Sequence, residues 1–123
     1  MNSPTPTDLR QKSCQPCEGG MAPLPRVEAE RLLESLDGWE LEGSEATIRR
    51  RWKVKDFMAG IAFLDRVAEV AEAEGHHPDI HLTGYRHVTI ELTTHAINGL
   101  SENDFILAAK IDDLDVELHQ PSS

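Results

Sequence analysis

One stretch of twenty residues limits the fold of this 123-residue chain more than any other. Apolar side chains recur at helical spacing from Lys55 to Glu74, and Gly75 follows where a left-handed glycine commonly ends a helix. The stripe that we expect this helix to bury consists of Phe57, Ile61, Leu64, Ala68 and Ala71, broadened by Met58, Val67 and Val70. A helix with one long apolar stripe needs a second layer to cover.

Short strands on both sides of this helix can supply that layer. Alternating apolar positions and turn residues predict strands over 39–41, 47–54, 79–82 and 87–93. Two further helices are predicted, one over 27–36 before Gly38 and one opened by the capping box at 101–104. Their expected apolar stripes are Val27, Leu32, Leu33 and Leu36 in the first, and Leu107, Ile111, Leu114 and Leu118 in the last.

The order of these elements is αββαββα, which predicts the fold class. Short hairpins make neighbouring strands antiparallel, so we expect an α+β domain of two layers: one four-stranded antiparallel sheet with the helices packed on one face. The last strand should divide into an inward set, Val88, Ile90 and Leu92, and an outward set, His87, Thr89 and Glu91. The open face and the free edges of such a sheet favour a homo-oligomer.

The ends of the chain differ in character from this domain, which we place at 26–118. Residues 1–25 are rich in Pro, Ser, Thr, Gln and Gly and predict a mobile N-terminal arm, dispensable for activity, and 119–123 form a short tail. The arm holds both cysteines of the chain, Cys14 and Cys17. A structural zinc needs four ligands, and a thioredoxin-type site needs a preceding strand, so we expect packing or disorder for this pair.

The composition excludes several classes of partner. A formal net charge of −10 and a pI of about 4.9 argue against direct binding of nucleic acid, which needs clustered cations. No stretch approaches the roughly 20 apolar residues of a membrane span. No basic region followed by an apolar one opens the chain, and cysteines are few, so we expect a cytoplasmic protein.

Three of the six histidines should meet at one edge of the sheet. A hairpin turning at 83–86 brings His76 and His77 opposite the end of the last strand, close to His95. Glu72, in the last turn of the long helix, points to the same edge. The helix dipole disfavours a carboxylate there, and orienting a histidine is one reason to keep it. Histidine both gives and takes protons near neutral pH, so this cluster predicts acid–base chemistry.

A metal site is the rival interpretation, and we disfavour it. Adjacent histidines point in different directions, so His76 and His77 are an awkward chelating pair. The ring of Pro78 fixes the backbone after them, which suits a rigid wall of a substrate pocket. We expect Asp104 to act only as the last residue of the capping box. The remaining histidines, which we expect to be solvated or satisfied within the fold, are His81, His87 and His119.

The motif around these histidines resembles that of a known protein family. The run Glu72-x-x-x-His76-His77-Pro78, followed by Tyr85, His95 and Asp104, is similar to that of the pterin-4a-carbinolamine dehydratases. The surrounding sequence agrees over about 25–112, most clearly at 38–39, 93–96 and 99–108. The Cys-Gln-Pro-Cys arm resembles those of bacterial and plant members.

The resemblance implies a reaction and a site. The substrate would be a 4a-hydroxytetrahydropterin, the adduct left by aromatic amino acid hydroxylases, which loses water to give the quinonoid dihydropterin. It implies no metal, no cofactor, and a homodimer or homotetramer. The residues it assigns are His76, His77 and His95 as catalytic, Glu72 in support, and Thr93 and Thr94 at the pterin ring.

A non-enzymatic role is the alternative from another class. Animal relatives also stabilise a dimeric transcription factor, and some carboxysome-associated relatives that assist Rubisco assembly have lost catalytic histidines. The presence of His76, His77 and His95 here favours the enzyme. A phenylalanine hydroxylase gene nearby would support dehydration, and Rubisco or molybdenum-cofactor genes would support the alternative.

Overall fold

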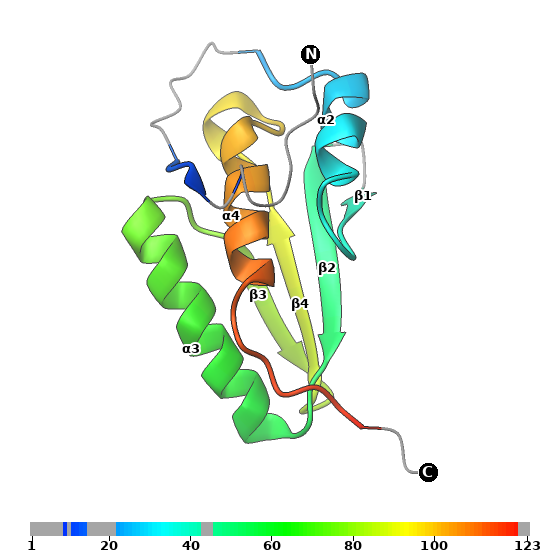
Figure 1. The fold of residues 1–123 in the computed structure, drawn as a ribbon, viewed down its shortest axis with the longest axis vertical. Helices are drawn as coiled ribbons and strands as arrows, with labels where there is room; N and C mark the ends of the chain where they lie inside the picture. The colour runs from blue at the N-terminus through cyan, green and yellow to red at the C-terminus, as the bar shows by residue number, and fades with distance from the viewer. Residues whose placement is uncertain (1–8, 10, 15–21, 43–45, 121–123) are drawn as a thin grey trace.

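The computed structural model describes residues 9, 11–14, 22–42 and 46–120. Its helices are α2 (Arg26–Leu33), α3 (Phe57–Glu74) and α4 (Glu102–Asp112), and a short 3-10 helix, η1, spans His95–Ile97. Its strands are β1 (Glu40–Glu42), β2 (Thr47–Lys53), β3 (Asp79–Thr83) and β4 (His87–Leu92). Apart from η1, the described elements follow the predicted order αββαββα (Figure 1).

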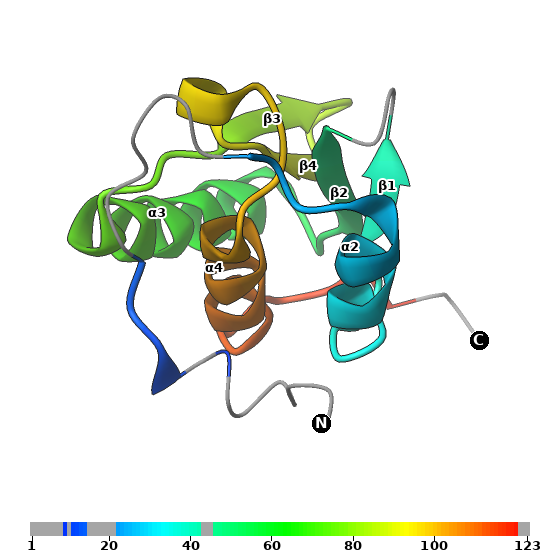
Figure 2. The ribbon, with the colours of Figure 1, turned by 90° about the horizontal axis from the view of Figure 1, so that it is seen from above.

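The strands form one antiparallel sheet in the order β1-β2-β4-β3. Each hairpin contributes one edge strand, and β2 pairs with β4 in the centre, where Arg50 lies opposite Ile90. Helices α2, α3 and α4 cover one face of the sheet, with α4 between the other two (Figure 2). The prediction of an α+β fold is therefore confirmed.

The alternation of β4 is as predicted. Val88, Ile90 and Leu92 are fully buried, whereas His87 is exposed on the other face. On the buried side Trp52 of β2 packs edge-on against Trp39 and Phe63, with ring centroids 5.9 and 5.0 Å away. These aromatic contacts join the sheet to α3 and form the centre of the core.

The buried face of α3 differs from the predicted stripe. Phe57, Met58 and Ile61 are 50%, 69% and 40% exposed, so the prediction is wrong for these residues. It is correct for Val67 and Ala71, which are buried. The side chains that α3 buries are Ala59, Gly60, Phe63, Val67 and Ala71. The small residues let the helix approach the sheet closely: a Cβ at Gly60 would lie 3.1 Å from Leu82 of β3. Apolar residues occur on both faces of α3, so periodicity alone could not identify the inner one.

The other two helices also depart from their predicted stripes. In α2, Leu32 is buried as predicted, but Val27 is 77% exposed and the second buried residue is Ala29. Helix α4 ends at Asp112, so Leu114 and Leu118 lie beyond it, and Leu118 pairs with Val54 in an isolated bridge. Because α4 lies between two helices and the sheet, it is buried on several sides and shows no single stripe (Figure 2).

Described residues of the predicted arm contact the domain. Leu9 is fully buried in the core, and the Leu24 N–H donates to the carbonyl of Leu100 at 2.8 Å. Mobility of the arm stays a prediction for 1–8, 10 and 15–21, which lie outside the described residues. Residues 121–123 of the tail also lie outside them. Within the described part of the chain, no helix combines the length and apolar character needed to cross a bilayer.

Candidate active site

Two histidines, His76 and His77, follow the end of α3, where the chain turns back toward β3. Asp56 caps its first turn, accepting from the Ala59 N–H at 2.8 Å, and Gly75 ends it in a left-handed conformation with φ of 65°. The backbone N–H groups of Gly75 and His76 donate to the carbonyls of Glu72 and Ala71, each at 3.2 Å. This turn reverses the chain, so the residues after it run from the helix end into β3.

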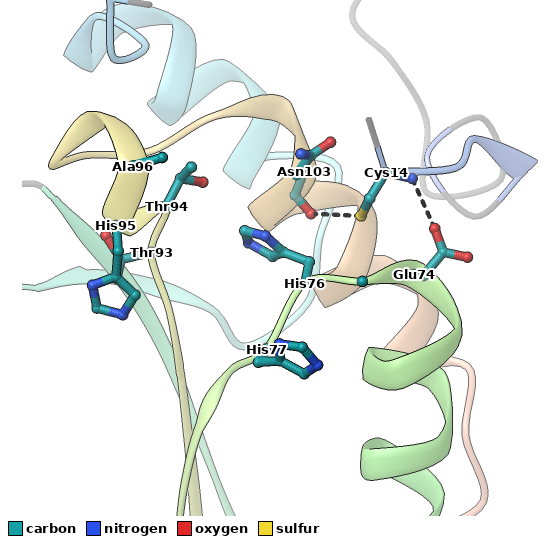
Figure 3. A pocket seen from close by; sticks show the side chains of 10 residues that line it. Cys14, Glu74, His76, His77, Thr93, Thr94, His95, Ala96 and Asn103 are labelled. Atoms are coloured by element: carbon teal, nitrogen blue, oxygen red, sulfur yellow. Dashed lines mark hydrogen bonds between the residues drawn. The ribbon is translucent and has the colours of Figure 1, made fainter. Parts of the chain in front are cut away.

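A cavity of about 420 Å³ opens between this turn and the segment that follows β4. Its lining residues are Cys14, Glu74, Gly75, His76, His77, Thr93, Thr94, His95, Ala96 and Asn103. Figure 3 shows His76 and His77 on one side and His95, with Thr93 and Thr94, on the other. Pockets for small ligands commonly measure about 300–1,000 Å³, so this one has room for a bicyclic substrate.

His76 is held by a buried carboxylate. Its Nε2 lies 2.6 Å from Oδ1 of Asp104, whose side chain is fully buried, while the His76 side chain is 12% exposed. This contact fixes the ring and leaves Nδ1 as the nitrogen available to a ligand. A carboxylate that orients an imidazole in this way is a recurrent arrangement in acid–base sites.

The second oxygen of Asp104 explains why a charge is tolerated there. Oδ2 accepts from the Ser101 N–H at 3.0 Å and from the Thr94 hydroxyl at 2.8 Å. The first bond completes the predicted capping box at the start of α4, where the helix dipole also favours negative charge. The prediction of a cap is confirmed, but it omitted the contact with His76. That contact joins residues 28 positions apart, so local pattern could not reveal it.

His77 and His95 differ from His76 in their surroundings. His77 Nε2 lies 2.6 Å from Oε1 of Glu72, and both side chains are largely exposed. Glu72 therefore contacts a histidine of the cluster, as its position suggested. His95 is exposed at the start of η1, and its side chain forms no hydrogen bond with the described residues. The cluster thus holds one largely shielded imidazole, that of His76, and two exposed ones.

The three residues predicted to contact a substrate, Thr93, Thr94 and Pro78, differ in how they lie relative to the cavity. The Thr93 hydroxyl lines the cavity and donates to the carbonyl of Ala46 at 2.5 Å. The Thr94 hydroxyl also lies at the cavity, but it is 4% exposed and bonded to Asp104 and Ser101, so it supports the His76 carboxylate. Pro78 is half-buried and lies outside the lining set.

Two lining residues that the sequence did not suggest as part of the site, Cys14 of the arm and Glu74 of α3, contact each other. Cys14 donates its backbone N–H to Oε1 of Glu74 at 2.7 Å, and Oε2 of Glu74 lies 3.4 Å from Lys110 of α4. Burial, followed by the charge of Glu74, raises the pKa of the Cys14 thiol to about 12. The hydrogen bond from Cys14 lowers the pKa of Glu74. An acidic residue at the end of a helix and a cysteine 60 positions away gave no local signal of this contact.

Among the described residues, no group of three His, Cys, Asp or Glu side chains is arranged to hold a metal ion.

The fold and the cavity define a class of protein: a small α+β domain with a histidine-lined pocket at one end of its sheet. The family model described as pterin 4 alpha carbinolamine dehydratase matches residues 22–114, and the chain belongs to this family of lyases. The resemblance inferred from the motif is thereby confirmed.

Curated relatives agree with this assignment. The mitochondrial pterin-4-alpha-carbinolamine dehydratase 2 of Arabidopsis thaliana is 50% identical over 113 residues, 89% of this chain and 60% of the relative. This chain therefore spans less than two thirds of the length of the plant protein. A putative pterin-4-alpha-carbinolamine dehydratase of Halorhodospira halophila is 50% identical over 106 residues, 86% of this chain and 96% of the relative.

Two solved structures share the fold. One is described as a transcriptional coactivator/pterin dehydratase from Brucella melitensis; its TM-score is 0.69 at 34% identity, over 74% of this chain and 96% of that one. The other is described as a pterin dehydratase-like protein that is a RuBisCO assembly factor in the alpha-carboxysome. Its TM-score is 0.53 at 28% identity, over 62% of this chain and 87% of that one.

Proposed function

We propose that this protein removes water from a 4a-hydroxytetrahydropterin to give the quinonoid dihydropterin. The observation that carries the proposal is the placement of His76 and His95 on opposite sides of one cavity (Figure 3). A flat bicyclic ring placed between them would have an imidazole on each side. Family membership supports the same substrate class.

The reaction needs two proton transfers, and the histidines can supply both. The hydroxyl at C4a leaves as water after taking a proton from an acid, and a ring N–H gives its proton to a base. One imidazolium and one neutral imidazole meet these needs, and each positioned group typically contributes about 10²–10⁴-fold. We assign the proton carriers to His76, His77 and His95, with Glu72 orienting His77. This chemistry calls for no metal or cofactor.

The substrate class has consequences for partners. A 4a-hydroxytetrahydropterin is formed by aromatic amino acid hydroxylases, so such an enzyme is the proposed functional partner. A cytoplasmic location and a homodimer or homotetramer complete the proposal. Support for the assembly comes from the edge strand β3, which is largely exposed, and from the exposed apolar side chains of α3.

A dehydration assay tests the proposal directly. The substrate is generated with phenylalanine hydroxylase, and the appearance of quinonoid dihydropterin is followed with and without this protein. We expect a clear acceleration that is proportional to protein concentration and lost in His95→Ala. A folded wild-type protein that leaves the spontaneous rate unchanged would refute the proposal.

A protein-binding role is the second candidate, favoured by one observation. Phe57, Met58 and Ile61 give α3 an exposed apolar surface that lies apart from the histidine cavity. The solved neighbours described as a coactivator/dehydratase and as an assembly factor make such a role worth testing. If cells that carry His95→Ala keep the phenotype of cells with the wild-type protein, a protein-binding role would be favoured over dehydration.

A further inference from the structure

The arm is attached beside the cavity at two described points. Leu9 lies in the hydrophobic core with no exposed surface. Five residues later, Cys14 reaches the cavity and bonds Glu74, and its Sγ lies 3.6 Å from the carbonyl oxygen of Asn103 (Figure 3). Cys14 therefore bridges the end of α3 and the first turn of α4, two elements that both border the cavity.

Glu74 is the centre of this attachment. One of its oxygens accepts the Cys14 N–H, and the other faces Lys110, so the carboxylate joins the arm to α3 and α4 together. The Glu74 and Lys110 side chains are 14% and 21% exposed, and a contact so shielded is screened less than a surface ion pair.

Cys14 lies on the same side of the cavity as the buried carboxylate of Asp104. Asn103 precedes Asp104, and Asp104 holds His76. We propose that the arm at Cys14 is a wall of the substrate pocket beside His76, and that Glu74 is the positioning residue that holds this wall in place. The proposal rests on the proposed function, since it assigns the wall to the pterin pocket.

Two consequences separate a pocket wall from a merely structural contact. A wall touches bound substrate away from the reacting atoms, so loosening it should raise KM and leave kcat almost unchanged. A bound pterin should also shield Cys14 from reagents in solution. A contact that only stabilises the fold would change neither KM nor the shielding.

The experiment uses the full chain with Cys17→Ser, so that Cys14 is the only thiol. Iodoacetamide alkylation at about pH 8 reports attachment, because release would return the pKa of Cys14 from about 12 toward 9.0. The thiolate fraction would then rise about a thousandfold, but nucleophilicity falls with pKa, so the net rate should rise about thirtyfold. We expect this rise in Glu74→Ala.

Glu74→Gln and Glu69→Ala provide the comparisons. Glutamine keeps an oxygen for the Cys14 N–H but loses the charge that faces Lys110, so its alkylation rate should fall between those of Glu74→Ala and the parent protein. Glu69 is an exposed glutamate on the same helix, and its replacement should leave the rate unchanged. Each variant is first checked for parental far-ultraviolet circular dichroism.

Kinetics and shielding complete the test. We expect Glu74→Ala to raise KM about fivefold with kcat within about twofold, and saturating dihydrobiopterin to slow alkylation of Cys14 in the parent protein. The proposal of a pocket wall would be refuted by an unchanged KM in Glu74→Ala, or by a Cys14 that is alkylated equally fast with dihydrobiopterin bound. Neither result would contradict the proposed dehydration. Absence of both dehydration and dihydrobiopterin binding would instead refute the proposed function, and the wall with it.

Discussion

His95 offers the cleanest residue-scale test of the site, because its exposed side chain forms no hydrogen bond with the described residues. His95→Ala removes a proton carrier without leaving a buried partner, so we expect turnover to fall about 10²–10⁴-fold with the melting temperature unchanged. His87→Ala, an exposed histidine on the open face of the sheet, should match wild type in the same assay. Full activity of folded His95→Ala would show that the cluster is not the catalytic site.

Asp104 should affect both activity and stability. Asp104→Asn keeps the shape but weakens the hold on His76 and the cap of α4, so we expect lower turnover and a lower melting temperature. Ser101→Ala removes the side chain of the same capping box and should cost about 1 kcal/mol of stability while turnover stays near wild type. Equal losses of activity in Asp104→Asn and Ser101→Ala would mean that turnover depends on the helix cap rather than on the contact between Asp104 and His76.

The sequence identified the histidines of the site better than the long-range contacts that hold them. His76, His77 and His95 could be grouped because the β3–β4 hairpin is local and its register, with Asp79 opposite Glu91, follows from the turn. The Asp104 contact and the Cys14–Glu74 bond join distant segments through tertiary packing. Such contacts leave no periodicity in the chain, so residue patterns could not predict them.

At the scale of elements, strands were more predictable than helix faces. Alternation in β4 separates buried from exposed positions because the sheet has one covered face. In α3 the apolar residues extend around the helix, and the small residues Ala59 and Gly60 define the inner face. In α4 nearly all side chains are buried, so no stripe exists to be found. Because Leu9 lies in the core, removing the whole arm should cost stability. That the arm is dispensable for activity stays a prediction.

Attachment of the arm to α3 and α4 should depend on pH at both ends of the range. The bond from Cys14 lowers the pKa of Glu74 below 4.5, so the attachment is favoured above that pH and weakens as pH falls through the lowered value. Burial raises the pKa of Cys14 from 9.0 to about 12, so the attachment weakens as pH rises from the first value through the second. The deuterium-exchange protection factor of the Cys14 amide should be greatest between these limits.

Glu74→Gln is the control for the acid side of that profile. Glutamine does not titrate, so the decline of protection at low pH should disappear, while the decline at high pH should remain. An unchanged acid limb in this variant would assign the effect to another group.

At the scale of the whole molecule, we expect an assembly of at least two chains. The sheet leaves β1 and β3 as its outer strands, and α3 exposes Phe57, Met58 and Ile61. Exposed apolar surface of this kind commonly marks an interface. Light scattering at micromolar concentration should return a multiple of 13.7 kDa, and Met58→Glu should shift it downward if α3 takes part. A 13.7 kDa particle in the parent protein would contradict the prediction.

The shared use of Asp104 constrains how such a chain could change over generations. A lineage that no longer needs dehydration could drop the exposed His95 at little cost. Loss of His76 alone would leave one oxygen of a fully buried carboxylate without its partner, a defect that commonly costs about 1–3 kcal/mol and more for a charged group. Descendants that abandon the chemistry should therefore lose His95 first, and should replace His76 and Asp104 together.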